Sequence, residues 1–167
     1  WEQIRTTICY NNQNVKIAGA HSGVSVGPDG ATHQAIEDIA ITRVIPNMVV
    51  IAPCDSIEAK KATIAAAKYK GPVYIRFTRE KTPVMTTDET PFEIGKAEIF
   101  REGKPARHAS QGDAGGDVTL IGCGPLVYEA LKAAEELAKE GFEAEVINNH
   151  TIKPMDKDTI LKSVKKT

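Results

Sequence analysis

The chain has few cysteines, few aromatic residues and almost no net charge. Its three cysteines (Cys9, Cys54 and Cys123) are widely spaced, and none forms the close pair or the Cys/His cluster of a metal site. An odd, scattered set also argues against a disulfide framework, so we expect a reduced, cytoplasmic protein without a bound metal. Because 21 Lys and Arg nearly balance 22 Asp and Glu, the formal net charge is -1, which gives no reason to expect nucleic acid or an anionic membrane as a partner.

Long hydrophobic runs are also missing. No apolar stretch approaches the roughly twenty residues that span a bilayer, and no basic-then-apolar leader opens the chain, so we expect no membrane segment. A hydrophobic content of 41% over 167 residues is nevertheless enough for one globular domain or two small ones. The chain opens on Trp1 instead of a methionine, which we interpret as a truncated or processed chain.

Strand and helix patterns alternate along the chain. In the first half the apolar, β-branched segments predict strands at 15–20, 48–53 and 73–78, with helices at 34–43 and 56–69. Three strands joined by two helices imply right-handed crossovers and a parallel sheet whose functional loops lie at the carboxyl ends of the strands. The second half predicts a strand or short hairpin at 92–102, strands at 118–121 and 143–148, a helix at 125–140 and a last helix capped by Asp156. The predicted fold class is α/β.

The composition changes after Arg79. Pro83, Pro91 and the polar run 86–90 indicate a connection between domains, so we divide the chain into residues 1–90 and 91–167. Residues 103–117 contain no large apolar side chain and cannot offset their ordering entropy by burial. We therefore expect a flexible loop at 103–117.

The clearest candidate site is the glycine-containing segment 27–34. It places a carboxyl group (Asp29) and an imidazole (His33) among glycines that permit unusual backbone geometry, and we expect Thr32 to cap a helix that begins near His33. His21 lies just upstream, at the end of the first strand, so three polar groups converge on one loop system. On spacing alone, an ordinary turn with a solvated acid and histidine is the alternative.

Four other features receive a structural interpretation. The turn Gly122–Gly124 looks like the start of a dinucleotide fingerprint, but Val127 stands where the third glycine would fall. Cys54 has no base nearby and is expected to be a small core residue. We interpret Arg76 as half of an ion pair at the end of the sheet, and His150 as a structural histidine.

The order of residues resembles transketolase and its relatives among the thiamine-diphosphate enzymes. The likeness is carried by His21–Gln34, Ile45–Asp55, Gly71–Arg79, 117–124 and 146–156, which cover nearly the whole chain in order. The resemblance implies part of the pyrimidine-binding domain followed by part of the C-terminal α/β domain. It is strongest to the separately encoded C-terminal half of split transketolases.

The resemblance implies that the complete enzyme transfers a two-carbon ketol unit between sugar phosphates in the pentose phosphate pathway, with thiamine diphosphate and Mg or Ca. The family's upstream glutamate and its diphosphate-binding domain have no counterpart in this chain. We therefore expect the isolated chain to be inactive and without bound cofactor, and we assign it no cofactor-binding residue. The expected partners are sugar phosphates and an N-terminal transketolase half, in a homodimer or heterotetramer.

Three alternatives to transketolase stay open. Two are enzymes that share this fold and cofactor, 1-deoxyxylulose-5-phosphate synthase and the β subunit of a 2-oxoacid dehydrogenase. The third is a module that serves only in assembly.

The resemblance also implies roles for four residues. His33 would hydrogen-bond the donor sugar near the reacting carbon, because a neutral imidazole can both donate and accept a proton there. Asp29 would hydrogen-bond a substrate hydroxyl, while His21 and Arg79 would bind the phosphate. Two positions, Pro28 and Ser22, differ from the residues that many members carry, which leaves the sugar preference open.

Overall fold

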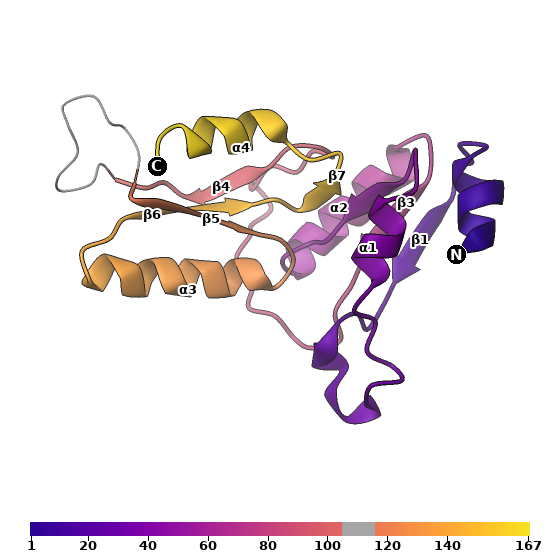
Figure 1. Ribbon diagram of the computed structural model, residues 1–167, viewed down its shortest axis with the longest axis horizontal. Helices are drawn as coiled ribbons and strands as arrows, with labels where there is room; N and C mark the ends of the chain where they lie inside the picture. The colour runs from indigo at the N-terminus through magenta and orange to yellow at the C-terminus, as the bar shows by residue number, and fades with distance from the viewer. Residues whose placement is uncertain (105–115) are drawn as a thin grey trace.

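The computed structural model describes residues 1–104 and 116–167 and contains two β-sheets (Figure 1). The first sheet has the strand order β1-β3-β2-β7, and the second has the order β4-β6-β5. This arrangement confirms the predicted α/β fold class. Most of the loop expected at 103–117 lies outside the described residues. The division of the chain at residue 90 stays a prediction.

The first sheet is parallel in its three N-terminal strands, as predicted. β3 (Val73–Arg76) lies between β1 (Lys16–Gly19) and β2 (Val49–Ile51), in parallel register with both. One face packs against α2 (Ser56–Lys68) through small helix side chains. The other face forms a second core cluster beneath the N-terminal π-helix η1 (Ile4–Cys9). The first sheet is thus packed on both faces by hydrophobic side chains, and this packing fixes the positions of the strand ends.

The strand β7 (Thr151–Lys153) joins the two halves of the chain and was not predicted. It pairs antiparallel with β2 and so adds a C-terminal strand to the N-terminal sheet. Just beside it, the Ala52 amide donates to the His150 carbonyl over 2.8 Å. The second half is therefore fastened directly to the carboxyl end of β2.

The second sheet is mixed and is covered by a helix on each face (Figure 1). β6 (Ala144–Asn148) pairs antiparallel with β4 (Glu98–Arg101) and parallel with β5 (Val118–Gly122). Side chains on one face of β6 pack against α3 (Leu126–Lys139). On the other face, the Ser163 hydroxyl of α4 (Lys157–Val164) donates to Glu145. As predicted, Asp156 caps α4, accepting from the Thr159 amide at 3.1 Å.

The helix predicted at 34–43 begins four residues late. α1 spans Asp38–Arg43, and the segment before it contains the short 3-10 helix η2 (Val24–Asp29). Ala35, inside the predicted helix, instead forms an isolated β-bridge with Ser22. Gly27 and Gly30 have positive φ values of 61° and 77°, so the chain turns at these positions and does not lead directly into the predicted helix.

The pattern of apolar and charged residues places Ile36 and Val44 toward the core and Lys61 toward water. The structure contradicts these three placements, as well as the Thr32 cap. Thr32 is not a helix cap, since its hydroxyl lies 2.9 Å from Nδ1 of the adjacent His33. Ile36 and Val44, predicted to face the core, are 65% and 66% exposed. On α2, Lys61 was predicted to face water, but its ammonium donates to the carbonyls of Thr87 and Thr90.

Within the described ranges, none of the helices combines the length and the apolar character that crossing a membrane requires.

Candidate functional site

The carboxyl ends of β1, β3 and β2 lie along one edge of the first sheet. A pocket of about 400 Å³ opens at this edge, between the ends of β2 and β3, the start of α2 and Pro125 at the start of α3. The carboxyl edge of a parallel sheet is where α/β folds bind their ligands. The polar side chains that line the pocket are Asp55, Ser56, Arg76, Thr78, Arg79, Glu80, Lys81 and Thr82.

The loop after β1 is fastened to the end of β3. Both the amide and the hydroxyl of Ser22 donate to the Phe77 carbonyl, at 3.0 and 2.9 Å, and the Gly23 amide donates to the Ala35 carbonyl at 2.8 Å. His21 precedes this anchor with a left-handed φ of 58°, and its side chain is exposed. The anchor therefore holds the histidine at the carboxyl edge while its ring stays open to solvent.

Two of the four predicted site residues are in direct contact. Nη1 of Arg79 donates to Oδ1 of Asp29 at 3.1 Å and to the Val26 carbonyl at 2.9 Å. The two side chains are each 40% exposed. The structure thus brings together residues 29 and 79, which lie on different loops. Within residues 1–104 and 116–167, the contacts recorded for Arg79 use Nη1 alone.

The two histidines share the loop with Asp29 but do not touch it. His21 and His33 are both exposed, and the contact recorded for the His33 ring is the one to Thr32. The structure therefore does not pair an acid with an imidazole at this loop. It pairs the acid with an arginine, and the two rings lie elsewhere on the same loop.

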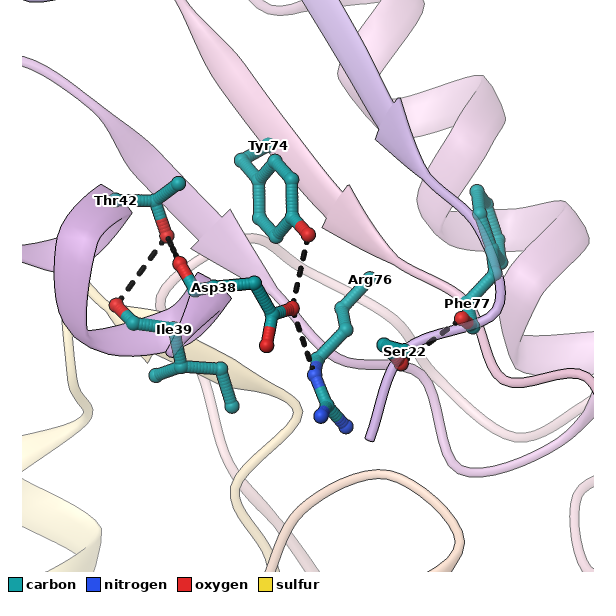
Figure 2. Close-up of polar contacts among 7 residues, drawn as sticks. All are labelled: Ser22, Asp38, Ile39, Thr42, Tyr74, Arg76 and Phe77. Atoms are coloured by element: carbon teal, nitrogen blue, oxygen red, sulfur yellow. Dashed lines mark hydrogen bonds and ion pairs between the residues drawn. The ribbon is translucent and has the colours of Figure 1, made fainter. Parts of the chain in front are cut away.

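Asp38, Tyr74 and Arg76 form a polar trio at the pocket that Arg76 lines (Figure 2). Asp38 and Tyr74 were not predicted from the sequence. Oδ2 of Asp38 accepts from the Tyr74 hydroxyl at 2.8 Å and from Nε of Arg76 at 2.9 Å. Burial, and then the bond to the Asp38 carboxylate, raise the pKa of Tyr74. The one available signal was the spacing of Tyr74 and Arg76, which places both on the same face of β3. The prediction that Arg76 forms an ion pair at the sheet end is confirmed.

The start of α2 is fixed by two buried carboxylates. Oδ1 of Asp55 accepts from the Glu58 amide at 2.8 Å and so caps the helix. Burial alone would raise the pKa of Asp55, but hydrogen bonds from Glu58, Thr86 and Met85 outweigh it and hold that pKa below its ordinary value. Glu58 itself accepts from the Cys54 amide at 2.6 Å and from Nδ2 of Asn148, on β6, at 2.7 Å. This carboxylate therefore ties α2 to the second sheet.

The interpretations of Cys54 and His150 agree with their surroundings. Cys54 is fully buried, and burial followed by the nearby Glu58 carboxylate raises the pKa of its thiol, which disfavours a nucleophilic thiolate. The His150 ring is fully buried and stacks on Phe92 with centroids 4.2 Å apart. Burial lowers its pKa from 6.5 to about 4, so the ring is neutral near pH 7.

The described residues contain no group of three or more His, Cys, Asp or Glu side chains that could hold a metal ion. What the edge of the sheet offers instead is arginine, hydroxyl and imidazole groups, which suit a polar, anionic organic molecule.

Two family models match the chain. The one described as "Transketolase, pyrimidine binding domain" covers residues 1–85, and the one described as "Transketolase, C-terminal domain" covers residues 108–167. A Methanocaldococcus jannaschii "transketolase C-terminal section" is 46% identical over 98% of this chain and 48% of its own length. A 6-deoxy-6-sulfo-D-fructose transketolase subunit from Clostridium sp. is 39% identical over 99% of this chain and 48% of its own length.

Solved structures agree with these relatives. A split-gene transketolase, titled an inactive beta4 tetramer, superposes with a TM-score of 0.84 at 37% identity, over 99% of this chain and 49% of that one. Transketolase from Campylobacter jejuni gives a TM-score of 0.70 at 28% identity, over 83% of this chain and 20% of that one. The chain thus spans about half the length of the curated relatives named above. In sequence and in fold, the chain belongs to the transketolase family.

Proposed function

We propose that this chain is the sugar-binding part of a split transketolase, which transfers a two-carbon ketol unit between sugar phosphates together with an N-terminal subunit. The observation that carries the proposal is the contact of Arg79 with Asp29 at the carboxyl edge of a parallel sheet. The loop that supplies Asp29 also carries His21 and His33. A cation, an acid and two imidazoles are the groups that a phosphorylated polyol needs for recognition.

In this proposal each residue acts on a different part of the sugar. Arg79 binds the phosphate, which replaces the Asp29 carboxylate at its guanidinium, and the exposed His21 ring assists it. Asp29 accepts a hydrogen bond from a substrate hydroxyl. His33, exposed at the other end of the loop, donates to and accepts from the oxygen next to the reacting carbon. In this proposal the residues of this chain bind the sugar, and binding of the cofactor is assigned to the partner subunit.

The names of two relatives support a substrate with an anionic end. One acts on a 6-deoxy-6-sulfo-D-fructose, and an Actinobacillus succinogenes protein, 35% identical over 98% of this chain, is an apulose-4-phosphate transketolase subunit. Each of these sugars carries a negatively charged group. For this chain we assign the anionic group as a phosphate. A cytoplasmic location and a homodimeric or heterotetrameric complete enzyme belong to the same proposal.

Reconstitution tests the function. The chain is mixed with a transketolase N-terminal section from the genome that encodes it, and complex formation is followed by size-exclusion chromatography. With thiamine diphosphate and Mg²⁺, we expect the mixture to transfer a ketol unit from xylulose 5-phosphate to ribose 5-phosphate, and neither chain to do so alone. A stable complex without transfer would overturn the proposal and favour an assembly module. Decarboxylation of pyruvate by the same complex would favour one of the two alternative enzymes.

A further inference from the structure

Arg76 is held by one edge of its guanidinium. Its Nε donates to Oδ2 of Asp38 at 2.9 Å, and the same oxygen accepts from the Tyr74 hydroxyl at 2.8 Å. Asp38 and Tyr74 are only 9% and 7% exposed, so the groups that anchor Arg76 are buried. Figure 2 shows the two terminal nitrogens of Arg76 pointing away from Asp38. The guanidinium is therefore fixed at its base while its terminal amino groups remain available.

This contact is not the one expected if the arginine served only to neutralise Asp38. An arginine and a carboxylate gain most from two parallel hydrogen bonds, one to each carboxylate oxygen. Here the second oxygen, Oδ1 of Asp38, is buried without a hydrogen-bond partner in the described structure. Across residues 1–104 and 116–167, the terminal nitrogens of Arg76 likewise have no recorded acceptor. Arg76 and Asp38 therefore do not form a bidentate ion pair, and the terminal amino groups of Arg76 point away from the carboxylate.

The Arg76 side chain lines the pocket of about 400 Å³ at the edge of the sheet. Arg79 and Lys81 line the same pocket, as does Ser56 in the first turn of the thirteen-residue α2. Glycine at position 23 also leaves room, because a Cβ there would lie 3.3 Å from Nη2 of Arg76. Hydrogen-bond donors from the end of β3 and from the start of α2 thus surround one cavity.

The carboxylates at the pocket do not use up these donors. Asp55 already accepts from the Glu58, Met85 and Thr86 amides and from the Thr86 hydroxyl, at 2.6 to 2.8 Å. Its four bonds satisfy both oxygens, so it does not compete for Arg76. Glu80, the other carboxylate in the lining, is an exposed side chain. The pocket therefore retains donors for an external anion.

We infer that Arg76 is a second phosphate-binding residue of this site, whose two terminal amino groups donate to two oxygens of the phosphate that Arg79 also binds. Asp38 is its positioning residue, because it fixes the plane of the guanidinium from behind. The inference rests on the proposed function and deepens it, since it makes the site selective for a tetrahedral oxyanion that can accept a bidentate contact. A lysine at this position would keep the charge but not the fork of two donors.

Binding of inorganic phosphate to the chain itself tests the inference without any catalytic assay. Isothermal titration calorimetry compares the wild type with Arg76→Lys and with the matched control Arg43→Lys, an exposed arginine at the end of α1. We expect Arg76→Lys to weaken phosphate binding about tenfold, because a charge-assisted hydrogen bond and the fixed fork are lost, and Arg43→Lys to leave it unchanged. The double variant Asp38→Asn/Arg76→Met avoids a buried unpaired carboxylate and should also bind at least tenfold more weakly.

The outcomes separate this inference from the proposed function. If Arg76→Lys and the double variant bind phosphate as tightly as the wild type, Arg76 is only structural, even when the reconstituted enzyme is active. Equal weakening by Arg43→Lys would mean non-specific binding and would also overturn the inference. A loss confined to the Arg76 variants, with unchanged folding by circular dichroism, supports it even when the reconstituted complex fails to transfer a ketol unit.

Discussion

Nη1 of Arg79 lies 3.1 Å from Oδ1 of Asp29, so in this chain the proposed phosphate-binding residue and the proposed hydroxyl-binding residue bind each other. Both side chains are 40% exposed, and an ion pair of this kind contributes about 0 to 1 kcal/mol. An incoming phosphate can therefore displace the Asp29 carboxylate from Arg79 at little cost. The displaced carboxylate is then free to accept from a hydroxyl of the same sugar.

The first prediction follows from this competition. Replacing Asp29 with Asn removes the charge that occupies Arg79, so inorganic phosphate should bind the chain two- to fivefold more tightly, corresponding to about 0.4 to 1 kcal/mol. The free energy of unfolding in urea should change by less than about 1 kcal/mol. Calorimetric titration measures the first quantity, and the exposed Asp88→Asn serves as the control. Weaker phosphate binding by Asp29→Asn would show that the ion pair organises Arg79 instead of competing with the ligand.

A second prediction separates His33 from Arg79 in the reconstituted enzyme. His33→Ala should lower kcat more than Arg79→Ala, because a group near the reacting carbon acts on the transition state. Arg79→Ala should chiefly raise KM for phosphorylated sugars, since a remote phosphate contact contributes mostly uniform binding. Steady-state kinetics with the donor and then the acceptor varied, each at saturating co-substrate, resolve the two constants. Equal effects of the two substitutions on kcat and KM would contradict the assigned roles.

The strands could be predicted from sequence because each is a short apolar run with nearby turn residues. The continuously apolar segment around Val50 and the β-branched segment from Val73 give both the strands and their burial. The start of α1 could not be placed, because the segment before Asp38 is held by a bridge from Ala35 to Ser22, a contact that local propensity does not contain. The strand β7 was missed for a similar reason, since it exists through its pairing with β2.

The candidate site was predictable in composition but not in its contacts. The glycine-rich loop identified Asp29 from the sequence, yet nothing local indicates that Arg79, which lies on a different strand end, would contact it. Glu58 and Asn148 are ninety positions apart and meet only because the fold brings α2 to the end of β6. Long-range polar pairs of this kind depend on tertiary geometry, so a single sequence does not reveal them.

The third prediction concerns the Glu58 carboxylate, which is 2% exposed and links α2 to β6. Glu58→Ala removes the acceptor of the Cys54 amide and of the Asn148 side chain, and should lower the free energy of unfolding by about 3 kcal/mol. The exposed Glu135→Ala on α3 should stay within about 0.5 kcal/mol of wild type. Urea denaturation at pH 7 measures both changes, and a loss for Glu58→Ala as small as that for Glu135→Ala would show that the link does not stabilise the fold.

The pH dependence of the same group gives a further check on its environment. Burial raises the pKa of Glu58 above its ordinary 4.5, so the neutral form is better tolerated in the folded state than the charged one. Its contribution to stability is therefore full below about pH 4.5 and is lost as the pH rises through the raised pKa. Glu58→Gln cannot ionise and should remove this part of the pH dependence.

The fourth prediction concerns His150, whose buried ring has its Nε2 without a partner in the described structure. Burial lowers the pKa from an ordinary 6.5 to about 4, so between these values the unfolded chain takes up a proton that the folded chain does not. This contribution to stability is present above pH 6.5 and is lost as the pH falls toward 4. By pH 5 the loss amounts to about 2 kcal/mol.

His150→Phe tests this directly, because the new ring can still stack on Phe92 but cannot be protonated. Near pH 7 the histidine is neutral in both the folded and the unfolded chain, so its protonation contributes almost nothing to the free energy of unfolding. The variant then loses only the contact of Nδ1 with the Thr151 hydroxyl at 2.9 Å. On acidification to pH 5 the variant should therefore lose about 2 kcal/mol less stability than the wild type. Urea denaturation at pH 5, 6 and 7 measures the difference, with the exposed His33→Gln as a control that should follow the wild type. Parallel pH profiles for His150→Phe and the wild type would mean that the ring is protonated within the fold, and that the packing against Phe92 opens to water.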